Sequence, residues 1–265
     1  RNVAVMINGV PQNDMENGWV YWSNWDGVAD AANSIQLQRG LSAVNLATPS
    51  IGGTMNIITD PASNERGGKF KQEGGAGNFL KTTFNYNTGL MMGDKLALSG
   101  TLVRKTGDGI IDATWTDAWA YYLGSSFQLN ENHRFELYAI GAPQRHGQNL
   151  YKQNIATYSQ DLASDVDGYD VTAFAEGNKF ETEAGRTFNQ NWGPVSSDYT
   201  GKQYWYMYGV GGLFGGGNQP RYNANFLNER ENFFHKPLVN LNHFMTINEK
   251  TRLSSVLYWS GGSGG

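Results

Sequence analysis

The chain has 265 residues, of which 39% are hydrophobic, 13% are aromatic and only 17% are charged. Disordered chains are rich in charge and poor in aromatic residues, so this composition predicts a folded protein of one or two domains. The absence of cysteine excludes disulfides, cysteine metal sites and a thiol nucleophile, and the net charge of −4 excludes a basic field for nucleic acid. No apolar run reaches the ~18 residues of a transmembrane helix.

The first 66 residues are predicted to form a small mixed domain. Asn8-Gly9 is a strong tight-turn pair at the end of the first strand, and Gly52-Gly53 precedes the last one. A linker containing proline and glycine sets a domain boundary near 60–68. The predicted elements are strands at 3–7, 35–38 and 54–59, and one helical turn at 28–33.

From residue 68 onward, apolar and polar residues alternate with a period of two, which predicts β-strands. One face of each strand is apolar or aromatic, and the other is small or polar. Short polar turns separate some of the strands, whereas the connections near 104–117 and 142–232 are long. Outer-membrane barrels show this asymmetry, while a soluble β-sandwich spreads its turns more evenly. The strands are predicted near 80–88, 96–102, 119–129, 135–139, 239–247 and 253–259.

Three segments of the first 66 residues resemble the plug domain of TonB-dependent outer-membrane receptors. Residues 4–11 look like the family's strand that closes in an Asp/Asn-Gly-x-Pro turn, here Asn8-Gly9-Val10-Pro11. Residues 34–40 resemble its strand that ends in Arg39-Gly40. Residues 51–59 are similar to the Gly-Gly-x-Ile-Asn-Ile-x-Thr stretch at the end of the plug. The segments follow the family's order, and together they indicate this family.

The resemblance implies a mainly β fold: a transmembrane antiparallel β-barrel of about 22 strands around a small α+β plug. Residues 141–148 look like an early extracellular loop of Bacteroidetes-type receptors. The chain carries about seven predicted strands, so we expect a fragment of a longer protein. Residues 1–66 are then the C-terminal part of the plug, and residues 67–265 are the N-terminal part of the barrel.

The resemblance also implies a function and a set of partners. The expected protein lies in the outer membrane of a Gram-negative bacterium and takes up a scarce ligand with energy supplied through TonB. Its expected partners are the TonB complex (through a plug segment outside this sequence), outer-membrane lipid, an imported ligand of unknown identity and a surface lipoprotein. We expect no nucleic-acid partner, no cofactor and no enzymatic activity.

The motif residues of the plug are expected to have structural roles. In the family, an arginine at the position of Arg39 belongs to a charged network between plug and barrel, and the alternative is an ordinary surface arginine. Gly52 and Gly53 are expected to allow a close backbone approach before a strand. Asn56, inside an apolar strand, is expected to hydrogen-bond neighbouring backbone.

The aromatic loop between residues 14 and 26 holds the best candidates for ligand contact. Aromatic side chains stack on flat ligands and sugars and bury a large area at small entropic cost. The alternative is that these residues pack the plug against the barrel wall or against a partner. The candidates are Trp19, Tyr21, Trp22 and Trp25.

The sequence gives little support for a metal site or for a catalytic site. Asp165 and Asp167, with Asp161 and Asp170 nearby, are weak calcium candidates, because the end positions of a calcium loop carry Ala163 and Phe174. A solvated acidic loop is the alternative. No nucleophile motif and no phosphate-binding loop are present.

Two further hypotheses stay open at this point. The strands are also compatible with a soluble or cell-surface all-β carbohydrate-binding module, or with a barrel that has a structural or secretion-accessory role. The orientation of the residue 119–127 strand distinguishes the module from the receptor. Its odd-numbered aromatic and aliphatic side chains face a protein core in the module and face lipid in the barrel.

Overall fold

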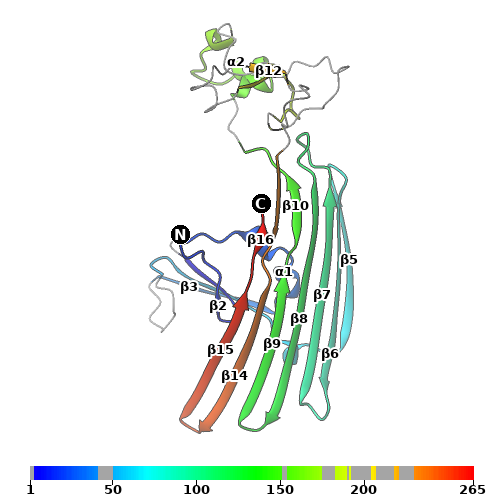
Figure 1. The fold of residues 1–265 in the computed structure, drawn as a ribbon, viewed down its shortest axis with the longest axis vertical. Coiled ribbons are helices and arrows are strands. Elements are labelled where there is room, and N and C mark those ends of the chain that lie inside the picture. The colour runs from blue at the N-terminus through cyan, green and yellow to red at the C-terminus, as the bar shows by residue number, and fades with distance from the viewer. Residues whose placement is uncertain are drawn as a thin grey trace.

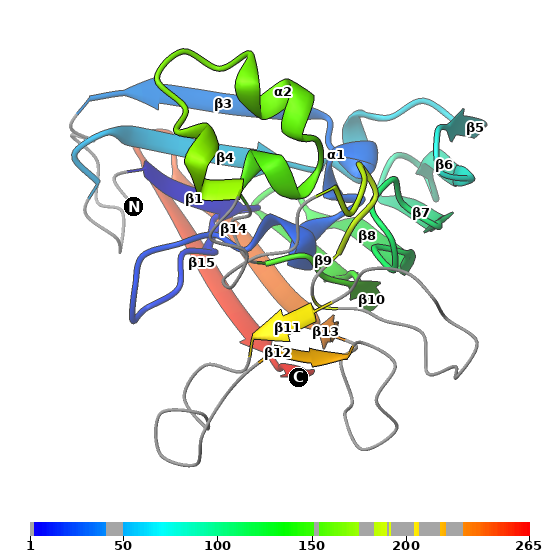
Figure 2. The same cartoon turned by 90° about the horizontal axis from the view of Figure 1, so that it is seen from above.

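The computed structural model describes residues 3–40, 50–150, 154–174, 183–189, 191, 204–206, 218–220 and 230–265. It contains a large curved antiparallel sheet and a small mixed sheet that lies against the concave side of the large one (Figures 1 and 2). We call the large sheet the wall, and residues 3–40 and 50–66 the inner domain. Among the described residues, no helix has the length and apolar character needed to cross a membrane.

The inner domain is built on a sheet of four strands in the order β2-β1-β4-β3. The central strands β1 and β4 are parallel, and the two outer pairs are antiparallel. Asn8 and Gly9 form the turn between β1 and β2, and both have positive φ, as a two-residue type I′ hairpin turn requires. The elements are β1 (Val3–Ile7), β2 (Val10–Pro11), η1 (Trp22–Trp25), α1 (Val28–Ala31), β3 (Ser34–Arg39), β4 (Gly53–Ile58) and η2 (Pro61–Ser63).

The wall contains ten strands, which combine into seven spans because three spans are interrupted. Pro143 and Pro237 lie at two of the interruptions, where a residue without an N–H group breaks the ladder. About seven strands were expected from the sequence. The wall strands are β5 (Gly67–Gly75), β6 (Phe79–Met91), β7 (Leu96–Gly107), β8 (Thr116–Asn130), β9 (His133–Gly141), β10 (Gln144–Gly147), β13 (Glu231–His235), β14 (Leu238–Asn248), β15 (Thr251–Ser260) and β16 (Ser263–Gly264).

The connections of the wall differ at its two ends (Figure 1). At one end, short turns join β6 to β7, β8 to β9 and β14 to β15. At the other end, the loop expected near 104–117 covers only residues 108–115, because the β7–β8 ladder continues to the pair Gly107 and Thr116. The loop expected near 142–232 begins after β10, and much of it lies outside the described residues. Its described elements are η3 (Ile155–Thr157), α2 (Gln160–Ser164), η4 (Val171–Phe174), β11 (Tyr204–Tyr206) and β12 (Asn218–Pro220).

The hydrophobic core lies between the inner domain and the wall. Side chains from both units form one buried cluster, so neither unit buries its apolar residues alone. This shared core fixes which face of the wall the inner domain covers. The cluster comprises Ile7, Val10, Trp25, Val28 and Ile57 from the inner domain, and Tyr122, Tyr138, Ile140 and Leu238 from the wall.

Candidate functional site

The convex face of the wall is apolar and exposed. Along β8, Trp119, Leu123, Phe127 and Leu129 point outward, and Leu123 is 61% exposed. A soluble monomer rarely exposes a continuous apolar face of this kind, because its contact with water is unfavourable. Further exposed residues of this face are Phe70, Leu80, Phe84, Leu98, Leu102, Leu137, Val239, Leu241, Leu253, Leu257 and Trp259. We call these residues the outer belt.

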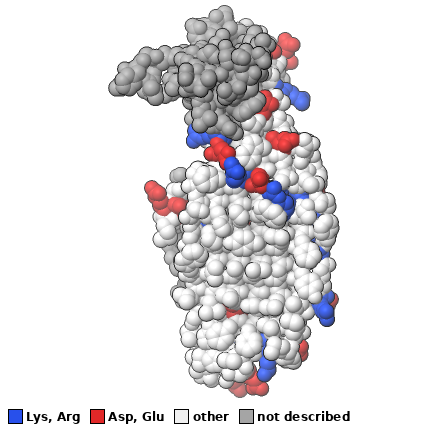
Figure 3. All heavy atoms as spheres, turned by 45° about the vertical axis from the view of Figure 1, so that its right-hand side comes forward, with Lys and Arg blue, Asp and Glu red and all other residues white. Residues whose placement is uncertain are grey.

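A row of charges borders the outer belt toward the long loops. Arg104 pairs with Asp117, and Arg145 with Glu231 at 2.6 Å, across strands β7, β8, β10 and β13. Figure 3 shows an almost uncharged face between this row and the charges near the short turns. From Trp119 to Leu129, ten residues of strand span ~33 Å, or ~25 Å in height at a tilt of ~40°. That height matches the apolar band of a membrane barrel.

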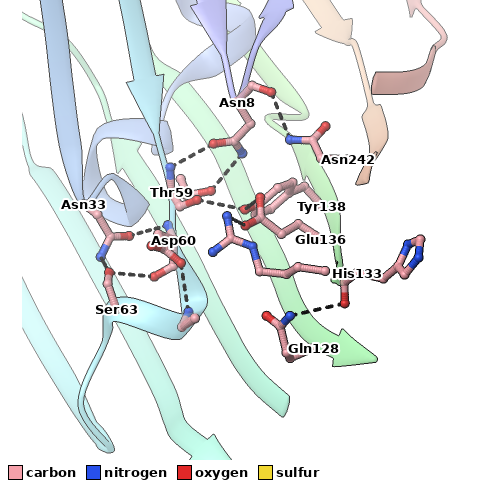
Figure 4. A network of polar contacts seen from close by, with 12 residues as sticks. Asn8, Asn33, Thr59, Asp60, Ser63, Gln128, His133, Glu136, Tyr138 and Asn242 are labelled. Carbon is pink, nitrogen blue, oxygen red and sulfur yellow. Dashed lines mark hydrogen bonds and ion pairs between the residues drawn. The ribbon is translucent and has the colours of Figure 1, made fainter. Parts of the chain in front are cut away.

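The concave face of the wall is polar and contacts the inner domain through hydrogen bonds (Figure 4). The Asn8 side chain bonds both the hydroxyl and the backbone N–H of Thr59, at 2.8 and 2.9 Å. From the wall, the Asn242 amide donates to the Asn8 carbonyl at 3.2 Å. The Tyr138 hydroxyl lies 3.0 Å from the Thr59 carbonyl and 2.8 Å from the carboxylate of Glu136, which is buried. These contacts join the strand ends of the inner domain to β9 and β14.

Two ion pairs join the inner domain to the wall on the other side. Lys81 on β6 contacts Asp30 of α1 at 2.8 Å, and both side chains are less than one-fifth exposed. Lys105 on β7 pairs with Asp26. Gly27, between these aspartates, has φ +89°, and a Cβ atom there would lie 2.6 Å from the Cβ of Ala120. Only glycine therefore allows α1 to approach the wall this closely.

A polar cavity of about 330 Å³ lies between α1 and the wall strands. Its lining includes Lys69, Asn85 and Ser99. Within the described part of the chain, three buried oxygens of its lining have no hydrogen-bond partner: Thr83 Oγ1, Asn87 Oδ1 and the Tyr122 hydroxyl. Buried polar groups require partners, so this cavity has the chemistry of a space that holds water or a polar solute.

The four aromatic candidates for ligand contact lie in two environments. Trp19, Tyr21 and Trp22 are each about half exposed. Trp25 is only 5% exposed and belongs to the core cluster, so in this conformation it packs the inner domain against the wall. Lys236 of the wall lies 5.9 Å above its ring. Ligand contact stays a prediction for the three exposed side chains.

Arg39 and Gly40 lie at the exposed end of β3. Arg39 has no ion-pair partner among the residues described, so its expected charged network stays a prediction. Gly40 has φ +78° directly after the strand. All six residues of β3 are exposed, and Ile35 and Leu37 are the apolar ones among them. This face of the inner domain is therefore not covered by the wall strands that are present.

The glycine pair and Asn56 lie at β4. Gly53 has φ +126°, and a Cβ atom there would overlap the carbonyl oxygen of Gln38 on β3. Gly52 is exposed in the bend directly before it. The Asn56 side chain accepts a hydrogen bond from the backbone N–H of Gly9 at 3.4 Å. Both observations concern backbone fit rather than ligand binding.

The calcium candidates do not form a ligand cluster. No group of three or more His, Asp or Glu side chains in the described ranges is arranged to hold a metal. Asp161 and Asp165 lie at the two ends of α2, and Asp167 is exposed after it. The Asp170 carboxylate accepts hydrogen bonds from the hydroxyl and backbone N–H of Thr172, which lower the pKa of Asp170.

Sequence reasoning missed the wall side of the polar interface. Glu136, Tyr138 and Asn242 carry no recognisable motif, and each looks like an ordinary residue of a polar strand face. Their common signal is that a carboxylate, a phenol and an amide occupy the inward positions of neighbouring strands. These residues can be recognised as neighbours only when the register between β9 and β14 is known.

The sequence matches no protein-family model and no curated protein. Solved structures do share the fold. The open form of the ferric-catecholate import receptor Fiu from E. coli K12 superimposes with a TM-score of 0.61 at 13% identity. The match covers 98% of this chain and 32% of that receptor.

Two further receptors match in the same way. The ferric yersiniabactin uptake receptor FyuA from Yersinia pestis has a TM-score of 0.57 at 15% identity, with 99% of this chain and 32% of that one covered. The alcaligin outer membrane receptor FauA from Bordetella pertussis has a TM-score of 0.57 at 7% identity, with 98% and 31% covered.

The chain thus spans about a third of the length of the receptors that it resembles. At these identities the likeness concerns the fold. It confirms the predicted fold class: the chain is mainly β, and its large antiparallel sheet matches part of a receptor barrel. The barrel is not closed by the strands present.

Proposed function

We propose that this chain is part of a TonB-dependent receptor in the outer membrane of a Gram-negative bacterium. The inner domain is the C-terminal part of its plug, and the wall is the first part of its barrel. The complete receptor takes up a scarce ligand in an energy-coupled manner. Support comes from the three plug-like segments of the sequence and from the shared fold of the uptake receptors.

One observation carries the proposal: the two faces of the same strands meet different surroundings. The outer belt exposes leucine, phenylalanine and tryptophan, while the opposite face bonds a separate folded unit through amide, hydroxyl and carboxylate groups. In water the outer belt is unfavourable, whereas lipid accepts it. A soluble carbohydrate-binding module has its apolar face inside, so the exposed orientation of Trp119 and Leu123 argues against that alternative.

The contacts between plug and wall suggest how transport begins. Hydrogen bonds to the wall at Asn8 and Thr59 hold one side of the plug, which we call the hydrogen-bonded side. Ion pairs to the wall at Asp26 and Asp30 hold the other, which we call the ionic side. TonB, acting on a plug segment outside this sequence, pulls on the plug and breaks the weaker contacts first. The polar cavity beside α1 lies where the ionic side opens.

The ligand class to test first is a ferric siderophore. Each of the three similar receptors carries a siderophore or a ferric chelate in its name. In this chain, the exposed Trp19, Tyr21 and Trp22 supply aromatic surfaces for a flat chelate. A Bacteroidetes-type receptor with a surface lipoprotein partner is a narrower form of the proposal. Its only sequence basis is the resemblance of residues 141–148 to an early extracellular loop of that type, and in the structure residues 144–147 form wall strand β10 rather than a loop.

Iron uptake in cells tests the proposed function. The gene encoding this chain is deleted, and uptake of radiolabelled iron as ferric catecholate is measured with and without a protonophore. We expect deletion to abolish uptake, complementation to restore it, and the protonophore to block it. Complementation with Trp22→Ala should reduce uptake, while Met15→Ala, at an exposed position of the same loop, serves as the control. Recovery of the protein in the soluble fraction, with its membrane fraction empty, would contradict the proposal.

A further inference from the structure

A single hydroxyl hydrogen faces two acceptors where the wall meets the inner domain. The Tyr138 hydroxyl oxygen lies 3.0 Å from the Thr59 carbonyl and 2.8 Å from a carboxylate oxygen of Glu136. Tyr138 and Glu136 are two positions apart on β9, so both point toward the inner domain (Figure 4). All three residues are buried. Because a hydroxyl donates only one hydrogen, Tyr138 cannot donate to both acceptors at once.

The protonation state of Glu136 decides where that hydrogen points. When Glu136 is ionised, its carboxylate accepts from Tyr138, because a charged acceptor forms the stronger hydrogen bond. The Thr59 carbonyl then loses its donor, since no other described residue bonds it. When Glu136 is protonated, its own hydroxyl donates to the Tyr138 oxygen, and the Tyr138 hydrogen turns to the Thr59 carbonyl. Only in the protonated state do both short distances correspond to hydrogen bonds.

The groups that face Glu136 make both states available. Arg134, on the same strand, lies 3.1 Å from the second carboxylate oxygen and stabilises the ionised form. Asp60 of the inner domain repels a negative charge at Glu136, and burial disfavours that charge as well. The phenol of Tyr122 on β8 and the amide of Asn242, directly opposite on β14, are the remaining neighbours. The Arg134 side chain is 38% exposed, so water at the short-turn end can exchange protons with the carboxyl group.

We propose that Glu136 is a positioning residue that controls the docking of the inner domain through its own proton. Uptake of a proton by Glu136 turns the Tyr138 hydrogen toward Thr59 and strengthens the hydrogen-bonded side, and loss of that proton weakens it. Since docking is coupled to proton uptake, the contact is tighter in acid and looser in alkali. This inference concerns the contact of the two units and does not depend on the proposed uptake function.

Thiol labelling of the full chain in detergent micelles, measured against pH, tests the proposal. Because the chain has no cysteine, Val10→Cys places a single thiol in the core that the two units share, at a position only 1% exposed. Met15→Cys places one in water as a reference. The ratio of the reference rate to the buried rate, measured with dithiodipyridine, is the protection of the interface, and the ionisation of the thiol cancels in it. Protection should rise by roughly 3- to 10-fold as Glu136 takes up its proton, the worth of one hydrogen bond.

Two substitutions in the Val10→Cys chain separate the proton from the fold. In Glu136→Gln, the amide group can donate to the Tyr138 oxygen while the amide oxygen accepts from Arg134, which reproduces the protonated arrangement. Its protection should stay at the acid value at every pH. Tyr138→Phe removes the hydrogen that Glu136 directs, so its protection should be low and the acid-dependent rise should vanish.

Glu231→Gln is the matched control, because Glu231 also pairs with a wall arginine but lies in the charged row beside the outer belt. Asp60→Asn examines the other acidic group of the interface. Both variants should keep the acid-dependent rise in protection. The proposal is overturned if Glu136→Gln or Tyr138→Phe keeps that rise, or if Glu136→Gln labels faster than the Val10→Cys chain at every pH. It is equally overturned if Glu231→Gln or Asp60→Asn abolishes the rise.

Discussion

The two faces of the wall are built from alternate residues of the same strands, yet they have opposite chemistry. On β8, Trp119, Leu123 and Phe127 face outward and are exposed, while Ala120 and Tyr122 face inward and are buried. The outward face has large apolar side chains. The inward face has small or hydrogen-bonding side chains, which allow the inner domain to approach. The comparison shows that the apolar side of a sheet need not be its core side.

The largest expected effect comes from placing a charge in the middle of the outer belt. Leu123→Arg should destabilise the chain in lipid vesicles by about 2–4 kcal/mol, because the guanidinium loses its hydration at the centre of the bilayer. Denaturant-induced unfolding in vesicles measures the change. Ile110→Arg, at an equally exposed position in the 108–115 loop, should change stability by less than ~0.5 kcal/mol. Equal effects at the two positions would contradict the assignment of this face to lipid.

The second prediction concerns the closest approach of the two units. Gly27→Ala and Gly93→Ala both place a side chain at positive φ, which costs about 1–2 kcal/mol. Only Gly27 is crowded by the wall, whereas nothing lies within 4 Å of a Cβ at Gly93. Gly27→Ala should therefore cost about 1–3 kcal/mol more than Gly93→Ala in unfolding free energy. If the two variants are equally stable, the inner domain does not contact β8 in this way.

The third prediction tests the hydrogen-bonded side of the interface. Tyr138→Phe removes a buried hydroxyl that lies within hydrogen-bond distance of the Thr59 carbonyl and the Glu136 carboxylate. The substitution should destabilise the chain by roughly 1–2 kcal/mol. Tyr258→Phe, which changes an exposed tyrosine of β15, is the control and should have little effect. A larger loss from Tyr258→Phe would mean that the polar network at Thr59 does not hold the inner domain.

The smallest effect is expected at the ionic side. A double-mutant cycle with Asp30→Asn and Lys81→Met should give a coupling energy of up to about 1 kcal/mol, because the pair is partly buried. The pair Lys71 and Glu73, which is more exposed and lies within one strand, should give a smaller coupling. A coupling for Asp30 and Lys81 no larger than that of the exposed pair would argue against an ionic side.

Alternation in the sequence predicted the long wall strands β6, β7, β8, β9, β14 and β15, but not the first strand β5 or the short strands β10, β13 and β16. The sequence pattern could not locate the breaks in the spans at Pro143 and Pro237, because proline is also common in loops. The expected loop near 104–117 was too long for a related reason: Arg104 and Asp117 look like loop residues but form a cross-strand pair. Polar composition alone does not separate a loop from a charged strand end.

The inner domain was predictable as elements but not as an arrangement. The turn at Asn8-Gly9 and the strand after Gly53 follow from local backbone preferences, whereas the parallel pairing of β1 with β4 depends on contacts that are distant in sequence. The bond between Asn8 and Asn242 joins residues 234 positions apart. The burial of Trp25 beside the exposed Trp22 likewise depends on the wall, so the aromatic loop alone did not distinguish packing from ligand contact.

The central claim is that the outward face of the wall contacts lipid, and a cysteine scan along β8 tests it most directly. Because the chain has no cysteine, single cysteines can be placed at each position from 118 to 129 and spin-labelled in lipid vesicles. Accessibility to oxygen dissolved in the bilayer should alternate, high at positions 119, 123 and 127 and low at positions 118, 120 and 122. Uniform accessibility, or the opposite alternation, would contradict the account.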